Sequence, residues 1–162
     1  MIIDIHNHPN YHGRPVEAML RNMDECGIDV TILLSWEAPE VEVDPRVKRT
    51  HSPFSSVPTP FSHCVEYKNA APDRFLLGYC PDPRLPDSIE RLIAVNNLYH
   101  PAMCGELKFR MMYDNPDAIR FYQAAGKLGL PVLMHFDYPQ PCGTVYPWIS
   151  GTAVTSTCWN GS

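Results

Sequence analysis

Apolar residues along this chain follow two alternating patterns: short, near-continuous runs, and longer stretches in which apolar positions recur every three or four residues. The short runs predict strands, and the spaced stretches predict amphipathic helices. Strands that alternate with helices in this way are typical of a parallel sheet with crossover helices, which indicates the α/β class. The predicted strands cover residues 2–7, 29–35, 74–80, 104–109 and 131–136.

Residues that start and end helices support the helical stretches. Pro15 suits the first turn of a helix, and Gly27 suits the position just after its end. The segment that begins at Asp87 resembles a capping box, and Asn115 is a predicted N-cap for a later helix that ends at Gly129. The predicted helices cover residues 15–26, 61–70, 87–98 and 116–128.

Two segments depart from this alternation. Residues 36–60 form a long loop rich in proline, serine and charged residues, and loops of this length are usually functional or mobile. The end of the chain is rich in glycine, serine and threonine and has neither the helical nor the strand period. We therefore expect a folded unit over residues 1–142 and an irregular tail over 143–162, whose composition suggests a truncation or a frameshift.

Length and charge limit the classes of partner. The 162 residues are enough for one domain with a hydrophobic core. The formal net charge of −5 argues against nucleic acid or an anionic membrane as the partner, because both favour a basic patch. No apolar run is long enough to cross a membrane, and the first residues lack the basic start of a signal peptide. The six cysteines form no C-x-x-C pair, which favours reduced thiols in a cytoplasmic protein.

The first strand ends in a His-x-His pair, His6 and His8. Side chains two apart on a strand point to the same face, so the two imidazoles can converge on one divalent cation. A strand that ends in two polar residues by chance is the alternative. Asp4 lies on the same face, where it either orients a ligand imidazole or hydrogen-bonds to the backbone.

Two further polar pairs follow later strands. Glu106 and Lys108 share a face of the fourth predicted strand, and His135 and Asp137 share a face of the fifth. In parallel α/β folds the carboxyl ends of the strands line the ligand site, so we expect these residues to lie close together. Three alternatives stay open. Glu106 could pair with Lys108, His135 could be a hydrogen-bonded core residue, and Asp137 could simply begin a turn.

Residues 3–8 (Ile-Asp-Ile-His-Asn-His), 105–108 (Gly-Glu-Leu-Lys) and 131–135 (Pro-Val-Leu-Met-His) together resemble the amidohydrolase superfamily. The nearest resemblance is to the amidohydrolase-related branch that includes aminocarboxymuconate-semialdehyde decarboxylase. The resemblance covers about residues 1–142. It implies a (β/α)₈ barrel of the TIM type with a divalent metal ion, most often zinc, at its C-terminal mouth. Because the pattern shows about five βα units, we expect a partial barrel that is truncated at its C-terminal end.

The resemblance implies roles for the polar residues at the strand ends. His6 and His8 correspond to the metal ligands of the first strand, and His135 corresponds to the ligand of the fifth. Glu106 resembles the glutamate that bridges metals in the TatD-like deoxyribonucleases. Zinc held by these four residues is therefore the expected cofactor.

The resemblance also implies a reaction. Members of the family mostly hydrolyse small organic substrates with metal-activated water, and some decarboxylate. Lys108 lies on the strand where two-metal members carry a carboxylated lysine, and Asp137 is the nearby substitute for a general base that the family supplies from later strands. We expect a metal-dependent hydrolase, with a decarboxylase or an inactive fragment as alternatives. A partial barrel leaves an open sheet edge, which a homo-oligomer could cover.

Overall fold

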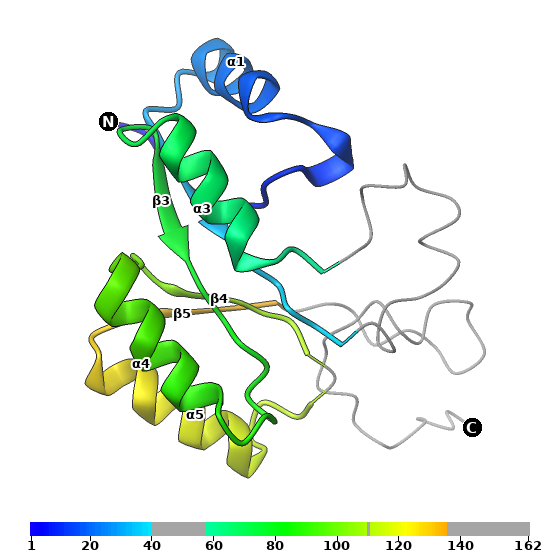
Figure 1. Cartoon of the computed structure of the whole chain (residues 1–162), viewed down its shortest axis with the longest axis vertical. Helices are drawn as coiled ribbons and strands as arrows, with labels where there is room; N and C mark the ends of the chain where they lie inside the picture. The colour runs from blue at the N-terminus through cyan, green and yellow to red at the C-terminus, as the bar shows by residue number, and fades with distance from the viewer. Residues whose placement is uncertain (40–57, 110, 136–162) are drawn as a thin grey trace, which may run out of the picture.

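Strands and helices alternate along the chain as the apolar pattern predicts (Figure 1). The computed structural model describes residues 1–39, 58–109 and 111–135. The strands are β1 (Ile3–Asn7), β2 (Val30–Leu34), β3 (Phe75–Gly78), β4 (Cys104–Leu107) and β5 (Val132–Met134). The helices are α1 (Val16–Cys26), α3 (Phe61–Ala70), α4 (Ser88–Tyr99) and α5 (Pro116–Lys127), with a 3-10 turn, η1 (Tyr11–Gly13), after the first strand.

The strands lie in the order in which they occur in the sequence. β1, β2 and β3 form one parallel sheet, and β4 and β5 form a parallel pair. A parallel bridge between Gly78 and Met103 connects β3 to the start of β4. Figure 1 shows α3 beside β3, with α4 and α5 side by side against β4 and β5. The predicted parallel α/β organisation is therefore confirmed in the described part of the chain.

The helix ends confirm two of the predicted end signals and contradict a third. Gly27 follows α1 with a positive φ of 66°, and the Asn115 side chain accepts a hydrogen bond from the backbone N–H of Asp117 at 2.8 Å. The predicted capping box at Asp87 is wrong, because its side chain makes no capping hydrogen bond. The Asp87 carboxylate instead pairs with Arg91, one turn further along, at 2.8 Å. A charge-assisted bond of this kind competes with capping for the same carboxylate.

The alternation of side chains along β2 explains why its sequence is almost entirely apolar. Leu33 faces the main core, where it packs with residues of the helices and of the neighbouring strands. Ile32 and Leu34 face the other side of the sheet and pack against Met103 and, less deeply, Leu133. Both faces of this central strand are buried, as in sheets that are covered on both sides.

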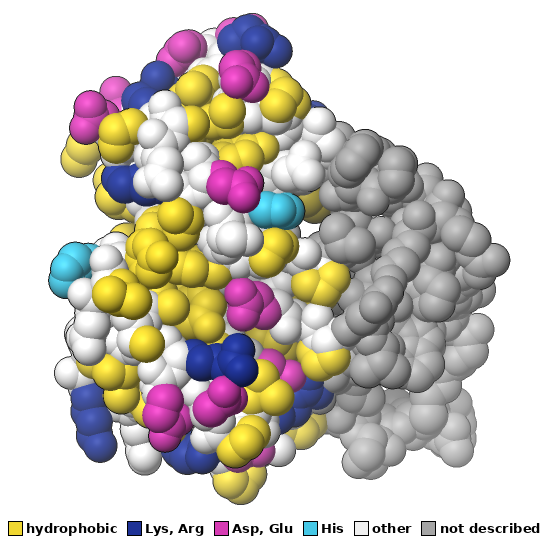
Figure 2. All heavy atoms as spheres, viewed as in Figure 1, with side chains coloured by type: hydrophobic (Ala, Val, Ile, Leu, Met, Phe, Trp, Pro, Cys, Tyr) yellow, Lys and Arg dark blue, Asp and Glu magenta, His cyan; other side chains and the backbone are white. Residues whose placement is uncertain are grey.

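The first strand has a free edge among the strands that the structure describes. There β1 pairs with β2 alone, and the side chains of Ile3 and Ile5 remain 43% and 52% exposed. Apolar side chains also gather on the face seen in Figure 2, in the region between α3 and α4. A homo-oligomer that covers the β1 edge stays a prediction.

Two expectations concern membrane spans and the segments without regular structure. None of the described helices is long and apolar enough to span a membrane. Most of the predicted loop over 36–60 and the predicted tail over 143–162 lie outside the described residues.

Candidate metal centre

Three strand ends bring polar side chains to one edge of the sheet. His6 lies within β1 and His8 directly follows it, Glu106 lies in β4, and His135 follows β5. Because all these strands are parallel, their carboxyl ends lie at the same edge. The structure therefore brings together the four residues that the sequence singles out as metal ligands.

The carboxylate of Glu106 is the centre of this cluster. It is only 1% exposed, and imidazole nitrogens approach both of its oxygens. Oε1 lies 3.3 Å from Nε2 of His6 and 2.5 Å from Nδ1 of His135, and Oε2 lies 3.1 Å from Nε2 of His8. The ligand atoms of His6, His8 and Glu106 all lie within 4.8 Å of one another. His135 joins this compact set through the carboxylate.

The orientation of His8 tests whether the cluster suits a cation. Its Nδ1 lies 2.9 Å from the carbonyl oxygen of Leu34 at the end of β2. A carbonyl only accepts, so Nδ1 carries the hydrogen, and Nε2 of the neutral ring has a lone pair. That lone pair faces a carboxylate oxygen, which also only accepts. Two acceptors in this position require a proton or a cation between them, and a backbone-oriented imidazole beside a buried carboxylate is a donor set that suits a divalent metal ion.

Both backbone polar groups of His135 form hydrogen bonds. Its backbone N–H donates to the carbonyl oxygen of Leu107 at 3.1 Å, and its own carbonyl accepts from the hydroxyl of Tyr113. With Nδ1 directed at Glu106, the remaining ring nitrogen carries the lone pair that a metal ion needs. The ring of His135 thus contacts the cluster through Glu106, and its role as a metal ligand stays a prediction.

Asp4 acts on the backbone of the histidine segment. Its Oδ1 accepts from the N–H of His6 at 3.1 Å, and its Oδ2 accepts from the side-chain amide of Asn7 at 3.0 Å. The amide oxygen of Asn7 in turn accepts from the N–H of His8 at 2.9 Å. Of the two alternatives for Asp4, the structure supports backbone hydrogen bonding. The sequence reading missed Asn7, although an amide between two histidines was its available signal.

The charges in the cluster support one another. Burial alone would raise the pKa of Glu106, but hydrogen bonds from His135 and His6, with a smaller contribution from the positive charge of Lys108, hold the pKa well below its usual range. The hydrogen bond to Glu106 raises the pKa of His6, against the opposing effect of burial. Glu106 is therefore an anion that attracts positive charge to this edge of the sheet.

Lys108 does not form the ion pair with Glu106 that the sequence left open. Its ammonium lies over the indole ring of Trp36, with Nζ 4.9 Å from the ring centre. Nε1 of Trp36 donates to the backbone carbonyl of Lys108 at 2.7 Å. Trp36 was also missed, because its link to Lys108 joins residues 72 positions apart. The second predicted catalytic residue, Asp137, lies outside the described residues.

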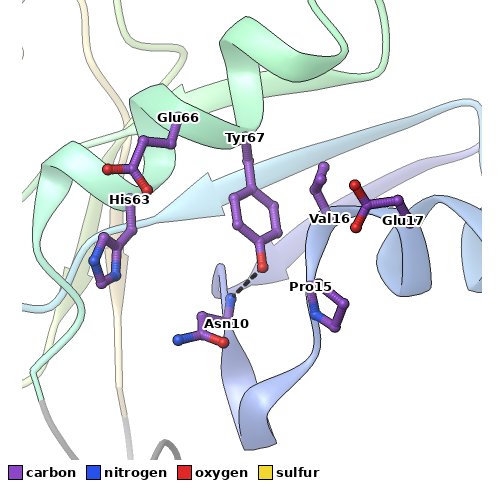
Figure 3. A pocket seen from close by; sticks show the side chains of 7 residues that line it. All are labelled: Asn10, Pro15, Val16, Glu17, His63, Glu66 and Tyr67. Carbon is purple, nitrogen blue, oxygen red and sulfur yellow. Dashed lines mark hydrogen bonds between the residues drawn. The ribbon is translucent and has the colours of Figure 1, made fainter.

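An open pocket of about 350 Å³ lies between the η1 turn and helix α3 (Figure 3). The hydroxyl of Tyr67 crosses it, accepting from the N–H of Asn10 at 2.9 Å and donating to the carbonyl of Arg14 at 2.6 Å. None of the four cluster residues lines this pocket. The hydroxyl at its centre already bonds within the protein on both sides.

No family model and no curated protein matches this chain. Among solved structures, 2,6-dihydroxybenzoate decarboxylase from Rhizobium matches 92% of this chain and 55% of its own, with 21% identity and a TM-score of 0.59. A 2,6-dihydroxybenzoate decarboxylase complexed with 2,6-dihydroxybenzoate matches 85% of this chain and 45% of its own, with 24% identity and a TM-score of 0.53. The chain thus spans about half the length of these chains, which are TIM-barrel enzymes. Its mixed α/β fold is consistent with part of such a barrel.

Proposed function

We propose that this chain carries the metal site of an amidohydrolase-superfamily enzyme, and that His6, His8, His135 and Glu106 hold a zinc ion. The observation that supports the proposal is the convergence of three imidazoles on one buried carboxylate. Histidine nitrogens with a carboxylate oxygen are a donor set that zinc prefers. The similarity of fold to decarboxylases of this superfamily adds support from outside the site.

The residues of the cluster would bind the cation, and their neighbours orient the ligand side chains. A bound divalent cation would act as a Lewis acid on a carboxylate or carbonyl oxygen and lower the pKa of a water molecule. Glu106 supplies the negative charge that offsets the cation, and Leu34 holds His8 in the tautomer that can bind it. Asp4 fixes the backbone that carries His6.

Decarboxylation of a small carboxylic acid is the reaction that we propose. In this reaction the bond between the carboxylate and its neighbouring carbon breaks, carbon dioxide leaves, and a proton takes its place on that carbon. The similar fold of the two decarboxylase structures favours this choice. We propose Asp137 as the residue that handles the proton, as its position two residues after His135 suggests.

Hydrolysis by a metal-activated water is the second candidate. The resemblance of residues 3–8, 105–108 and 131–135 to a superfamily of mainly hydrolytic enzymes favours it. The two reactions would share the metal ligands, so only the substrate separates them. In hydrolysis Asp137 would act as the general base.

Metal content tests the site before any substrate is known. The purified full chain is dialysed against zinc and then against buffer, and its zinc is measured by elemental analysis. We expect about one ion per chain in the wild type and a clear loss in His6→Ala and His135→Ala. His63→Ala is the matched control, because His63 lies on α3 away from the cluster.

The reaction is then tested with the zinc-loaded chain. Release of carbon dioxide from 2,6-dihydroxybenzoate or a related acid supports decarboxylation, whereas turnover of esters or amides alone supports hydrolysis. Unchanged zinc in both histidine variants would contradict the metal site. Full zinc binding with no turnover of either substrate class would contradict an active enzyme and leave a metal-binding fragment.

A further inference from the structure

Trp36 and Lys108 make two contacts with each other beside the candidate metal centre. The indole N–H of Trp36 donates to the Lys108 carbonyl, and the Lys108 ammonium lies over the indole ring. Trp36 itself is fixed by an antiparallel bridge to Thr59. A cation–π contact attracts an ammonium but leaves its charge in place. The ammonium is therefore held in one position while it remains a cation.

This cation differs from four of the arginines that the structure describes. Within the described residues no carboxylate pairs with Lys108. By contrast, Arg74, Arg84, Arg91 and Arg120 each pair with an aspartate. The Lys108 side chain is half-buried. A partly desolvated ammonium without an anion is unfavourable, so an anionic ligand would gain from binding there.

The position of Lys108 brings this charge close to the cluster. Lys108 lies two residues after Glu106, directly beyond the end of β4. The backbone N–H of Glu106 donates to the carbonyl of Ser35 at 2.9 Å, and Ser35 directly precedes Trp36, so the Trp36–Lys108 pair lies next to the cluster. The site thus combines the buried carboxylate of Glu106 with a nearby cation held on Trp36.

We propose that Lys108, held on the indole of Trp36, binds the carboxylate of a small monocarboxylic acid substrate next to the metal centre. This inference rests on the proposed function, because it concerns the substrate of that same site. It makes Lys108 a substrate-binding residue with a free ammonium. A carboxylated, metal-bridging lysine, the role that the sequence resemblance implies, is the competing assignment.

Variants of Lys108 separate the two assignments. Lys108→Met keeps the length of the side chain and removes its charge, whereas Lys108→Arg keeps a charge that cannot be carboxylated into a metal ligand. Lys127→Met, on the exposed end of α5, is the matched control for loss of one positive charge. Zinc content and ligand affinity are measured for each variant.

The probes are 2,6-dihydroxybenzoate and its neutral counterpart resorcinol, titrated into the full chain in a calorimeter. We expect Lys108→Met to keep its zinc and to bind 2,6-dihydroxybenzoate about 10- to 100-fold more weakly than the wild type, with resorcinol unaffected. Lys108→Arg and Lys127→Met should stay within a few-fold of the wild type. The same titrations are repeated on the zinc-free chain.

Each other outcome decides against one of the two claims. Equal binding of the acid by Lys108→Met and the wild type overturns the inference, as does a wild type that does not bind 2,6-dihydroxybenzoate. Loss of zinc from Lys108→Met overturns it in favour of the bridging role. A wild type that takes up no zinc overturns the proposed function, and the zinc-free titrations then still decide whether Lys108 binds the carboxylate.

Discussion

Nε2 of His8 lies 3.1 Å from Oε2 of Glu106, and both atoms can accept a hydrogen bond but not donate one in the tautomer that the backbone imposes. A buried pair of acceptors is unfavourable unless positive charge lies between them. The same carboxylate faces His6 and His135 through its other oxygen. The cluster therefore attracts a cation.

Glu106→Gln should weaken zinc binding, because the amide has nearly the shape of the carboxylate but lacks its negative charge. We expect a loss of affinity of at least about 10-fold, measured by competition with a chromophoric chelator. Glu90→Gln, at an exposed position on α4, controls for the loss of one negative charge. Equal affinities in Glu106→Gln and the wild type would show that the carboxylate contributes nothing to the site.

Asp4→Ala should act through the backbone of the histidine segment. The variant removes the two hydrogen bonds that Asp4 accepts from His6 and Asn7, so His6 becomes less well positioned. We expect zinc affinity to fall by about 10-fold, less than in His6→Ala. Asp73→Ala, an exposed substitution before β3, serves as the control. A loss as large as that of His6→Ala would contradict a purely positioning role.

The open edge of β1 should mediate self-association. Ile3 and Ile5 expose apolar surface beside backbone groups that no described strand pairs with, and such edges favour pairing with another chain. We expect Ile5→Lys to shift the chain toward the monomer in sedimentation velocity experiments. Ile119→Lys changes an equally apolar exposed residue on α5 and should leave association unchanged. A wild type that is monomeric at high concentration would rule out this interface.

Stability should decline in alkaline solution through Tyr79. Burial, with a smaller contribution from Glu37, raises the pKa of its hydroxyl above the usual value of about 10. A group whose folded-state pKa is raised stabilises the protein fully below the unfolded pKa and loses this contribution as pH rises through the folded pKa. We therefore expect the free energy of unfolding to fall from about pH 10 upward.

Denaturant unfolding between pH 8 and pH 11 checks this prediction. Tyr79→Phe should reduce the alkaline decline, whereas Tyr99→Phe, at a more exposed position on α4, should reduce it less. If the decline is as steep in Tyr79→Phe as in the wild type, burial of Tyr79 is not its cause.

Local sequence signals predicted the elements to within about two residues, because each element depends mainly on its own pattern of apolar residues and end signals. The Asn115 cap is one such signal, and it is confirmed. The capping box at Asp87 failed because Arg91 offers the same carboxylate a stronger partner, and propensity does not reveal which partner a side chain selects.

The candidate site was only partly accessible from the sequence. Parallel strands bring their carboxyl ends to one edge, so the proximity of His6, Glu106 and His135 could be predicted from topology. Whether Glu106 meets imidazoles or Lys108 depends on distances between strands, which no spacing encodes. The Trp36–Lys108 contact could not be predicted for the same reason, and the role of Asp137 remains a prediction.

X-ray absorption at the zinc edge of the zinc-loaded chain tests the central claim most directly. The cluster predicts nitrogen and oxygen ligands at about 2.0–2.2 Å, with the multiple-scattering pattern of imidazole. That pattern should weaken in His8→Ala. Sulfur ligands at about 2.3 Å, or a wild-type spectrum without imidazole, would contradict a metal centre built on His6, His8, His135 and Glu106.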